Sequence, residues 1–199
     1  ANSALKFAGV DSFAVRRCVF RNLAAGAFDL NTCHQGVIAE CRFENCLTGG
    51  HIKGGASFIT MERNLFLNAS RDGWVAFELG GDTSPEFYCP GSTTEVNDLK
   101  FHSNIVAGGY RGLALSSAVH CDVASNTFYE CGQATMRFLT TSTHFPALTG
   151  NTVRNNIFAF GAASQYMNGS QQSAGAVSFE GNIYCSTTSA AFNGPYWDS

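Results

Sequence analysis

A short phrase recurs seven times along the chain: a Cys or Asn followed two residues later by an aromatic or aliphatic residue. The phrases are Cys18-Val-Phe20, Cys41-Arg-Phe43, Asn64-Leu-Phe66, Asn104-Ile-Val106, Asn126-Thr-Phe128, Asn156-Ile-Phe158 and Asn182-Ile-Tyr184. They are spaced 23, 23, 40, 22, 30 and 26 residues apart. A repeat in the twenties is typical of a solenoid, in which each coil packs only against its neighbours.

Apolar residues alternate with polar ones on both sides of each phrase, which is the pattern of short β-strands. Three residues before each phrase lie Val15, Ile38, Met61, Phe101, Val123, Val153 and Phe179. A second strand is expected about ten residues after each phrase, at Phe28/Leu30, Ile52, Val75/Phe77, Leu113/Leu115 and Met136/Phe138. The alternation slips by one residue just before each Cys or Asn, which predicts a bend between two strands.

This pattern predicts an all-β fold, a parallel β-helix solenoid of about seven to eight coils. Like residues then stack on like, and the recurring Asn side chains are expected to form an amide ladder. We expect one domain over residues 1–199 without an N-terminal cap, so that the first coil presents an open sheet edge. Such an edge favours a homo-oligomer through the first coil, while the run 191–197 suits covering the last coil.

Composition excludes several functional classes. The net charge is −3, from 12 basic and 15 acidic residues, and no basic stripe points to nucleic acid. No apolar run reaches the length of a membrane span. The spacing of the eight cysteines matches no zinc site, and free core thiols are favoured at positions 18, 41, 46, 121 and 131. Cys89 is a candidate for a disulfide.

Three insertions interrupt the regular spacing, at 80–96, 140–150 and 161–175. Insertions in a solenoid are loops on one face, and that face is often the binding face. Phe87 and Tyr88 in the first insertion suit stacking against a sugar, but aromatic residues equally serve to pack a loop onto its own coil.

Charged residues are expected to line up on the outer side of the second strand. Asp29, Lys53 and Glu78 follow each other at steps of 24 and 25 residues, with Arg137 further on and His51 on the same face as Lys53. One interpretation is a catalytic row, and the other is a ladder that alternates charge between neighbouring strands.

A third interpretation of these charges is a divalent-cation site. Asp29 and Glu78, with Asp82 from the inserted loop, would supply the oxygen ligands that Ca²⁺ prefers. Lys53 lies between the two carboxylates and counts against this interpretation, so that no metal and no other cofactor is predicted.

The recurring V-x-x-x-N-x-F pattern resembles the right-handed parallel β-helix proteins of the pectate-lyase-like superfamily, over essentially the whole chain. The stretches His51-Ile-Lys53-Gly-Gly-Ala-Ser57 and Trp74-Val-Ala-Phe-Glu78-Leu-Gly-Gly81 are most similar to uncharacterised bacterial β-helix repeat proteins. The resemblance implies a right-handed coil, a polysaccharide partner and a secreted, cell-surface or periplasmic location.

A more distant similarity links the chain to polysaccharide lyases of the alginate-lyase and chondroitinase-B type. Ile52-Lys53-Gly54 resembles the phrase that carries their catalytic Lys, whereas Glu78 stands where they carry an Arg. An acidic residue there would repel a uronate, so Lys53 would need a different partner, Arg111 or Arg137.

Two classes of function remain open. The chain is an enzyme, a polysaccharide lyase or glycoside hydrolase using Lys53, Asp29, Glu78 or Arg137, with His51, Asp82, Phe87, Tyr88 and Arg111 as binding residues. Alternatively it is a non-catalytic carbohydrate-binding or oligomerising module, or a fragment of an adhesin or tailspike.

Overall fold

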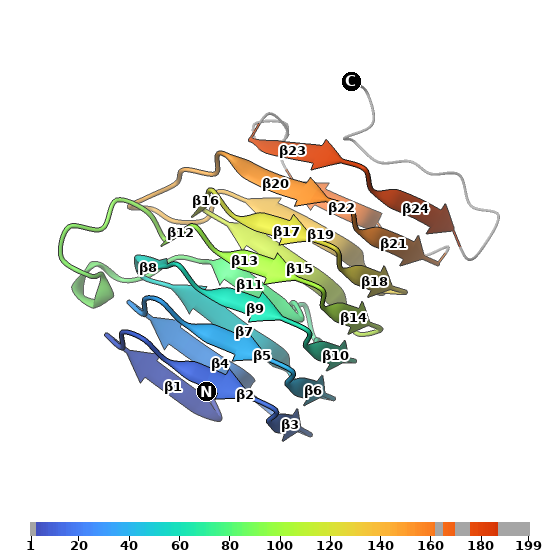
Figure 1. The fold of residues 1–199 in the computed structure, drawn as a ribbon, viewed down its shortest axis with the longest axis horizontal. Helices are drawn as coiled ribbons and strands as arrows, with labels where there is room; N and C mark the ends of the chain where they lie inside the picture. Colours follow the sequence, from blue (N-terminus) through green and yellow to red (C-terminus); the bar gives the residue numbers. More distant parts are fainter. Residues whose placement is uncertain (1–2, 162–164, 170–175, 187–199) are drawn as a thin grey trace.

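The strands of the chain stack into a parallel β-solenoid of seven coils, shown in Figure 1 for a computed structural model. The structure describes residues 3–161, 165–169 and 176–186. Three seven-stranded parallel sheets, A, C and D, run along the solenoid, and a short sheet B joins them in the central coils. The prediction of an all-β parallel solenoid is therefore confirmed.

Each coil contributes one strand to each long sheet. Sheet A contains β1 (Leu5–Ala8), β4 (Gly26–Asn31), β7 (Thr48–Lys53), β11 (Phe77–Gly80), β15 (Arg111–Ser116), β19 (Ala134–Leu139) and β22 (Gln165–Gly169). Sheet C contains β2 (Ala14–Arg16), β5 (Val37–Ala39), β9 (Thr60–Glu62), β13 (Lys100–His102), β17 (Asp122–Ala124), β20 (Asn151–Arg154) and β23 (Val177–Glu180).

The recurring phrase itself forms sheet D. Its strands are β3 (Val19–Arg21), β6 (Arg42–Glu44), β10 (Leu65–Leu67), β14 (Ile105–Ala107), β18 (Thr127–Tyr129), β21 (Ile157–Phe160) and β24 (Ile183–Ser186). Sheet B consists of β8 (Ala56–Ser57), β12 (Val96–Asn97) and β16 (Ala118–Val119). One short 3₁₀ helix, η1 (Pro85–Phe87), lies in the loop between β11 and β12.

A single left-handed residue makes the bend between sheets C and D in every coil. The residue before each Cys or Asn has a φ between +53° and +58°, namely Arg17, Glu40, Arg63, Ser103, Ser125, Asn155 and Gly181. The left-handed conformation is unfavourable for residues other than Gly, Asn and Asp. The packing of the neighbouring coils must therefore stabilise it at these positions. This bend explains the one-residue slip in the alternation of apolar residues.

The Asn ladder stabilises these bends from inside. In the fifth coil, Asn126 Oδ1 accepts hydrogen bonds from the backbone N and from Nδ2 of Asn104, at 2.8 and 3.1 Å. Asn126 Nδ2 in turn donates to the Phe101 carbonyl and to Asn156 Oδ1, at 2.8 and 2.9 Å. Asn126 is 1% exposed. Its amide therefore satisfies two backbone groups at the bend, the Asn104 N–H and the Phe101 carbonyl.

Cysteine takes the place of Asn in the first two coils and reproduces part of this pattern. Cys41 Sγ lies 3.6 Å from the Val15 carbonyl, the group that an Asn amide would bind, and its backbone N donates to Asn64 Oδ1. All eight cysteines lie in the described residues and are free thiols, Cys89 included. Cys33 is fully buried, although the sequence did not place it clearly inside.

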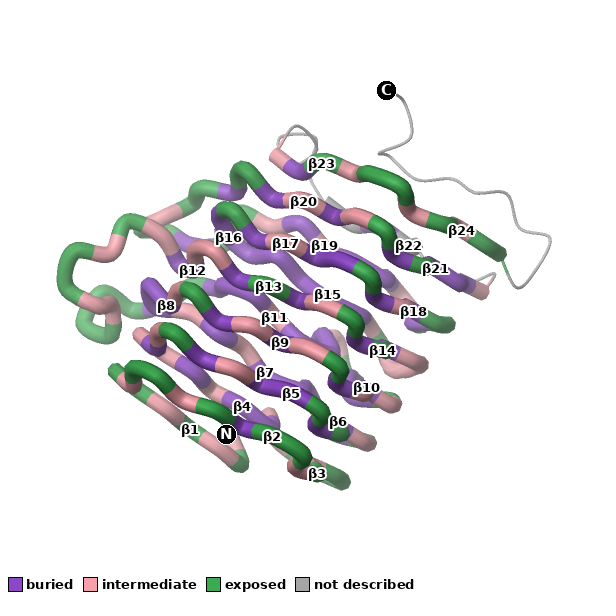
Figure 2. The backbone as a smooth tube through the Cα atoms, viewed as in Figure 1, coloured by how far each residue is buried: buried purple, intermediate pink, exposed green. Residues whose placement is uncertain are grey.

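The interior is a continuous apolar column, and Figure 2 colours the buried residues of each coil purple. The ring of Phe43 stacks on those of Phe20 and Phe66, at centroid distances of 5.3 and 4.5 Å, and Phe158 stacks on Phe128 and Tyr184. Among the described residues, no helix has the length and apolarity needed to cross a membrane.

Two of the expected insertions are loops outside the regular coil. The first lies between Gly80 and Val96, and the second spans 140–150, between β19 and β20. The third, 161–175, differs from the expectation because residues 165–169 form β22, which pairs with β19 in sheet A. Residues 162–164 and 170–175 and the run 191–197, expected to cover the last coil, lie outside the described residues.

Candidate functional site

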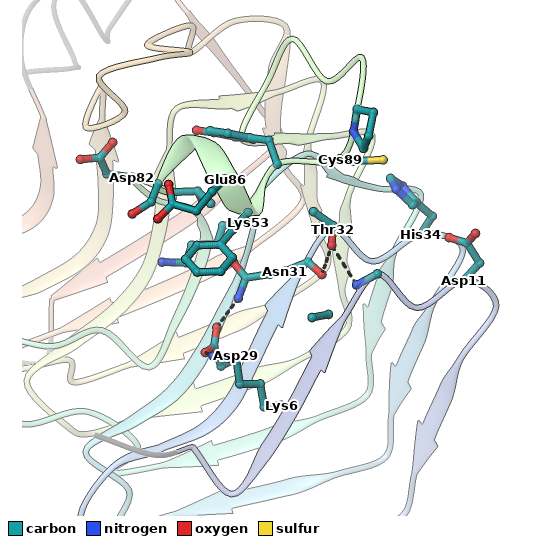
Figure 3. A pocket seen from close by; sticks show the side chains of 17 residues that line it. Lys6, Asp11, Asp29, Asn31, Thr32, His34, Lys53, Asp82, Glu86 and Cys89 are labelled. Atoms are coloured by element: carbon teal, nitrogen blue, oxygen red, sulfur yellow. Dashed lines mark hydrogen bonds and ion pairs between the residues drawn. The ribbon is translucent and has the colours of Figure 1, made fainter.

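The loop between β11 and β12 projects from the side of the solenoid and walls a cavity of about 580 Å³ (Figures 1 and 3). We call this cavity the outer groove. Its floor is formed by residues of the first three coils. These residues are Lys6, Ala8, Gly9, Asp11, Asp29, Asn31, Thr32, His34 and Lys53. Residues 82–84 and 86–90 of the inserted loop, which belongs to the fourth coil, form its wall. A loop from one coil thus leans back over three earlier ones.

The charged row on the outer side of sheet A differs from the predicted row. Asp29 pairs in register with His51, and His51 pairs with Glu78. Lys53 pairs with Asn31 instead of lying between the two carboxylates. The predicted stacking of Asp29, Lys53 and Glu78 is therefore wrong.

The reason for this difference is the length of the turns that precede the strands of sheet A. Residues 22–25 precede β4, only residues 45–47 precede β7, and residues 68–76 precede β11. Equal sequence steps therefore do not correspond to equal positions in the strands. The inward partner of Ile52 is accordingly Leu79, and Val75 lies before β11.

Asp29 is held by three donors at the edge of the groove. Asn31 Nδ2, His51 Nε2 and Lys6 Nζ lie 2.7, 2.9 and 3.1 Å from its carboxylate oxygens. The hydrogen bond from His51 is the main cause that lowers the pKa of Asp29 far below its ordinary value, with a smaller contribution from Lys6. A carboxylate held in its ionised form in this way is a poor proton donor and a weak base.

Lys53 lines the groove, and its stem passes beside Gly81. A Cβ atom placed on Gly81 would lie 3.2 Å from Lys53 Cδ, so the glycine leaves room for the lysine stem. Among the described residues, no carboxylate lies within ion-pairing distance of the Lys53 ammonium group. Lys53 is thus available to a ligand in the groove, as one of the two ammonium groups that line it.

The wall is anchored by Glu95, which is fully buried and which the sequence analysis missed. Its carboxylate accepts hydrogen bonds from the backbone N of Gly54, from the backbone N and hydroxyl of Thr83, and from the Tyr88 hydroxyl. Burial alone would raise the pKa of Glu95, but these hydrogen bonds lower it below the ordinary value. An ionised carboxylate without a cationic partner therefore fastens both ends of the loop to the third coil.

The second inserted loop, 140–150, supports the first from behind. Asp82 Oδ1 accepts a hydrogen bond from the backbone N of Thr143, at 3.0 Å. Ser142 Oγ lies 3.2 Å from the Tyr88 hydroxyl, and the ring of Phe145 meets the Tyr88 ring edge-on at 4.8 Å. Burial, followed by the Glu95 carboxylate, raises the pKa of Tyr88 to about 12, so Tyr88 remains a hydrogen-bond donor. These contacts join the wall to the second inserted loop.

A row of polar residues closes the far end of the groove. Asp11, His34 and Ser57 pair in register on three successive coils, and His34 Nδ1 lies 2.8 Å from Ser57 Oγ. Figure 3 shows Asp11 and His34 at the opposite end from Asp82. The three positions are spaced by 23 residues, so the repeat contained the signal for this row.

The predicted site residues divide into two groups. Asp29, Lys53, Asp82, Phe87 and Tyr88 all line the outer groove, and His51 binds Asp29 from below. By contrast, Glu78, Arg111 and Arg137 do not line it. In the described part of the chain, no group of three or more His, Cys, Asp or Glu side chains is arranged to hold a metal ion.

The groove combines polar and charged side chains with apolar surface, including one exposed aromatic ring. Phe87 is 60% exposed, although it lies on a wall that is otherwise fastened down. Four carboxylates, Asp11, Asp29, Asp82 and Glu86, outnumber the two ammonium groups, which gives a net charge of −2 with His34 counted as neutral. Such a surface can donate and accept many hydrogen bonds, but it repels polyanions.

Comparison with known proteins places the chain by its fold. No curated protein matches it. A family described as the right handed beta helix region matches residues 3–190. This match covers nearly the whole solenoid and agrees with the seven stacked coils, and the chain belongs to the right-handed β-helix family.

Proposed function

We propose that this protein binds an uncharged stretch of a polysaccharide in the outer groove. The observation that carries the proposal is the wall itself: a loop of the fourth coil folds back over the first three and holds an exposed aromatic ring above a polar floor. Sugar rings present apolar C–H faces and hydroxyl edges, so an aromatic platform beside many hydrogen-bonding groups fits their chemistry.

The construction of the wall supports a binding role. Burying the Glu95 carboxylate costs solvation free energy, which its hydrogen bonds to the loop offset. A loop held in one conformation at such a cost is typical of a segment with a function. The anchor leaves Phe87 outside, where its ring is exposed to solvent. The loop therefore presents an exposed aromatic ring in the same groove as Asn31 and Lys53.

The charge of the groove favours neutral sugars over polyuronates. A β-elimination mechanism requires a cation to neutralise the uronate carboxylate, and the carboxylates of the groove outnumber its ammonium groups. Lys6, one of these two ammonium groups, is already paired with Asp29 at 3.1 Å. A glycan with hydroxyl groups alone avoids this repulsion and can use Asn31, Thr32 and the acidic side chains as acceptors and donors.

The test is a binding comparison between two phenylalanine variants. Neutral hexasaccharides of glucose, xylose, mannose and galactose, and a hexagalacturonate, are titrated into wild type, Phe87→Ala and Phe58→Ala. Phe58 is 59% exposed and lies outside the groove, so it is a matched control for loss of an exposed ring. We expect at least one neutral hexasaccharide to bind wild type and Phe58→Ala equally, and Phe87→Ala about tenfold more weakly.

Two results would contradict the proposal. One is the absence of binding to every neutral hexasaccharide. The other is binding that Phe87→Ala and Phe58→Ala weaken to the same extent, since the ligand would then lie elsewhere on the solenoid.

A further inference from the structure

Cys18 and Cys41 continue the Asn ladder into the first two coils, one directly above the other. The strand pairs before and after them are in register, so the two cysteines occupy equivalent positions of neighbouring coils. The Arg42 N–H donates to the Cys18 carbonyl at 2.9 Å and fixes this register next to the pair. Equivalent residues of neighbouring parallel strands have Cα atoms about 4.8 Å apart, within the range of about 4.4 to 6.8 Å that a disulfide spans.

Both cysteine side chains point into the solenoid. Cys41 is 2% exposed and belongs to the apolar core, whereas Cys18 packs against that core and remains partly exposed. Side chains at this position touch from coil to coil, as Asn64 Nδ2 does with Asn104 Oδ1 at 3.0 Å. Burial raises the pKa of the Cys41 thiol, and the side chain of Cys18 adds to this effect. The two sulfur atoms are therefore neighbours, and no other cysteine begins a phrase of the repeat.

The two thiols differ in what can reach them. A reagent in solution has access to Cys18, because this side chain is partly exposed. Cys41 is closed to solvent, and its thiol donates weak hydrogen bonds to the carbonyls of Val15 and Ala39, at 3.6 and 3.4 Å. Since the thiolate is the reactive form, Cys18 is suited to react first and Cys41 to complete the reaction from inside.

We propose that Cys18 and Cys41 are an oxidation site, at which a small disulfide such as oxidised glutathione produces a covalent bond between the first two coils. The Cys18 thiolate attacks one sulfur of the oxidised glutathione, which releases one glutathione and leaves a mixed disulfide. The Cys41 sulfur, after losing its proton, attacks the Cys18 sulfur and releases the second glutathione. The two cysteine sulfurs are oxidised, the glutathione disulfide is reduced, and the two thiol protons pass to the released glutathione thiolates.

This bond would act on the outer groove because both coils supply its floor. Lys6 and Asp11 come from the first coil, and Asp29 comes from the second. Lys6 bonds to Asp29 at 3.1 Å, across the boundary between the two coils. A covalent link restricts the movement of one coil relative to the other and so preorganises the floor. This consequence rests on the proposed function, whereas the oxidation site does not.

The direct test is a mass-spectrometric search for the bond. Wild type is equilibrated with oxidised or with reduced glutathione, its free thiols are blocked, and it is digested with trypsin and a glutamate-specific protease. This digestion yields the peptides 18–21 and 41–42 and keeps Cys33 apart from both. We expect oxidised glutathione to link the two peptides, and Cys185→Ser, which lacks an exposed thiol elsewhere, to give the same result. Absence of the linked peptide, or a mixed disulfide with glutathione that persists on Cys18 of wild type, would overturn the proposal.

Single variants test the order of the two steps. In Cys41→Ala we expect Cys18 to accumulate as the mixed disulfide with glutathione, because the second thiol is missing. In Cys18→Ala we expect Cys41 to stay unmodified, because it is closed to solvent. Modification of Cys41 by glutathione in Cys18→Ala would contradict this order.

Hydrogen exchange shows whether the bond links the coils. We expect residues 5–21 to exchange about tenfold more slowly in oxidised than in reduced wild type, and dithiothreitol to reverse the change. Cys18→Ala should show no dependence on the glutathione ratio. Equal or faster exchange in oxidised wild type would contradict the proposed link.

Glycan binding separates the oxidation site from the proposed function. We expect a neutral hexasaccharide that binds wild type to bind the oxidised protein about threefold more tightly, with no such difference in Cys18→Ala. Equal affinities would refute the effect on the groove. A linked peptide without any glycan binding would refute the proposed function and support the oxidation site, and glycan binding without the linked peptide would do the reverse.

Discussion

The inner and outer sides of the same strands follow different rules. Inside, each coil repeats the one before it: Asn stacks on Asn from the third coil to the seventh, and aromatic rings stack along the phrase. Outside, sheet A changes at every step, from Lys6 to Asp29, His51, Glu78, Ala114 and Arg137. Stacking in register makes repetition favourable in the core, whereas like charges on adjacent strands repel each other. The outer side is therefore where a ligand site can arise.

We expect the largest loss of stability when the Asn ladder is broken. Asn126→Ala removes one acceptor and one donor group that together serve Asn104, Asn156 and the Phe101 carbonyl, and leaves these buried groups unsatisfied. We expect a loss of about 3 to 4 kcal/mol in the free energy of unfolding, measured by urea denaturation. The matched variant Cys41→Ala removes only a weakly bonded thiol at the equivalent position and should cost about 1 kcal/mol. Equal losses of unfolding free energy in the two variants would mean that the Asn amide stabilises its coil no more than the Cys thiol does.

The next effect concerns the wall of the outer groove. Glu95→Gln keeps the shape of the side chain but turns one acceptor oxygen into a donor that faces Thr83, Tyr88 and the Gly54 N–H. We expect a local cost of about 2 to 3 kcal/mol, seen as faster hydrogen exchange over 81–95 with little change in sheet D. If residues 81–95 exchange at the same rate in wild type and Glu95→Gln, the loop is held by other contacts.

The same carboxylate predicts a pH dependence. The pKa of Glu95 is lowered in the folded protein, so its ionised form contributes stability in full above the unfolded value of about 4.5. This contribution is lost as the pH falls below 4.5 through the lowered folded value. The hydrogen-exchange protection factors of residues 81–95, which correct for the intrinsic pH dependence of exchange, should therefore fall in wild type below pH 4.5 and change less in Glu95→Gln. An identical acid response in the two proteins would contradict this assignment.

The smallest effect comes from extending the ladder. Cys41→Asn would place an amide beside the Val15 carbonyl, which now meets only a thiol at 3.6 Å. We expect a gain of about 0.5 to 1 kcal/mol by urea denaturation, because one neutral hydrogen bond replaces a weak one. Destabilisation by more than 1 kcal/mol would show that the first coils cannot accept the geometry of the later ones.

The inner side could be predicted from the sequence because its signal is local and repeated. The phrase ending at Phe43 or Phe128 has a fixed length in every coil, so the strands of sheets C and D follow directly from it. Sheet A is separated from the phrase by turns of different lengths, before β4, β7 and β11. A count of residues therefore placed Lys53 beside Asp29, where His51 lies.

Part of the candidate site was predicted for the same reason. The loop 80–96 interrupts a regular spacing, so the wall and its aromatic residues Phe87 and Tyr88 could be recognised. The role of Glu95 could not, because a buried carboxylate without a cation depends on the loop folding back onto Gly54. The pairing of Asp29 with His51 likewise depends on a register that only the structure shows.

The most direct test of the outer groove is a footprint of the bound glycan. Backbone NMR shifts of the protein are recorded with and without the neutral hexasaccharide that binds most tightly. The account predicts saturable changes grouped at Asn31, Thr32, Lys53 and residues 82–90, with sheet D unaffected. Changes grouped on sheet C or D, with the groove residues unmoved, would contradict it.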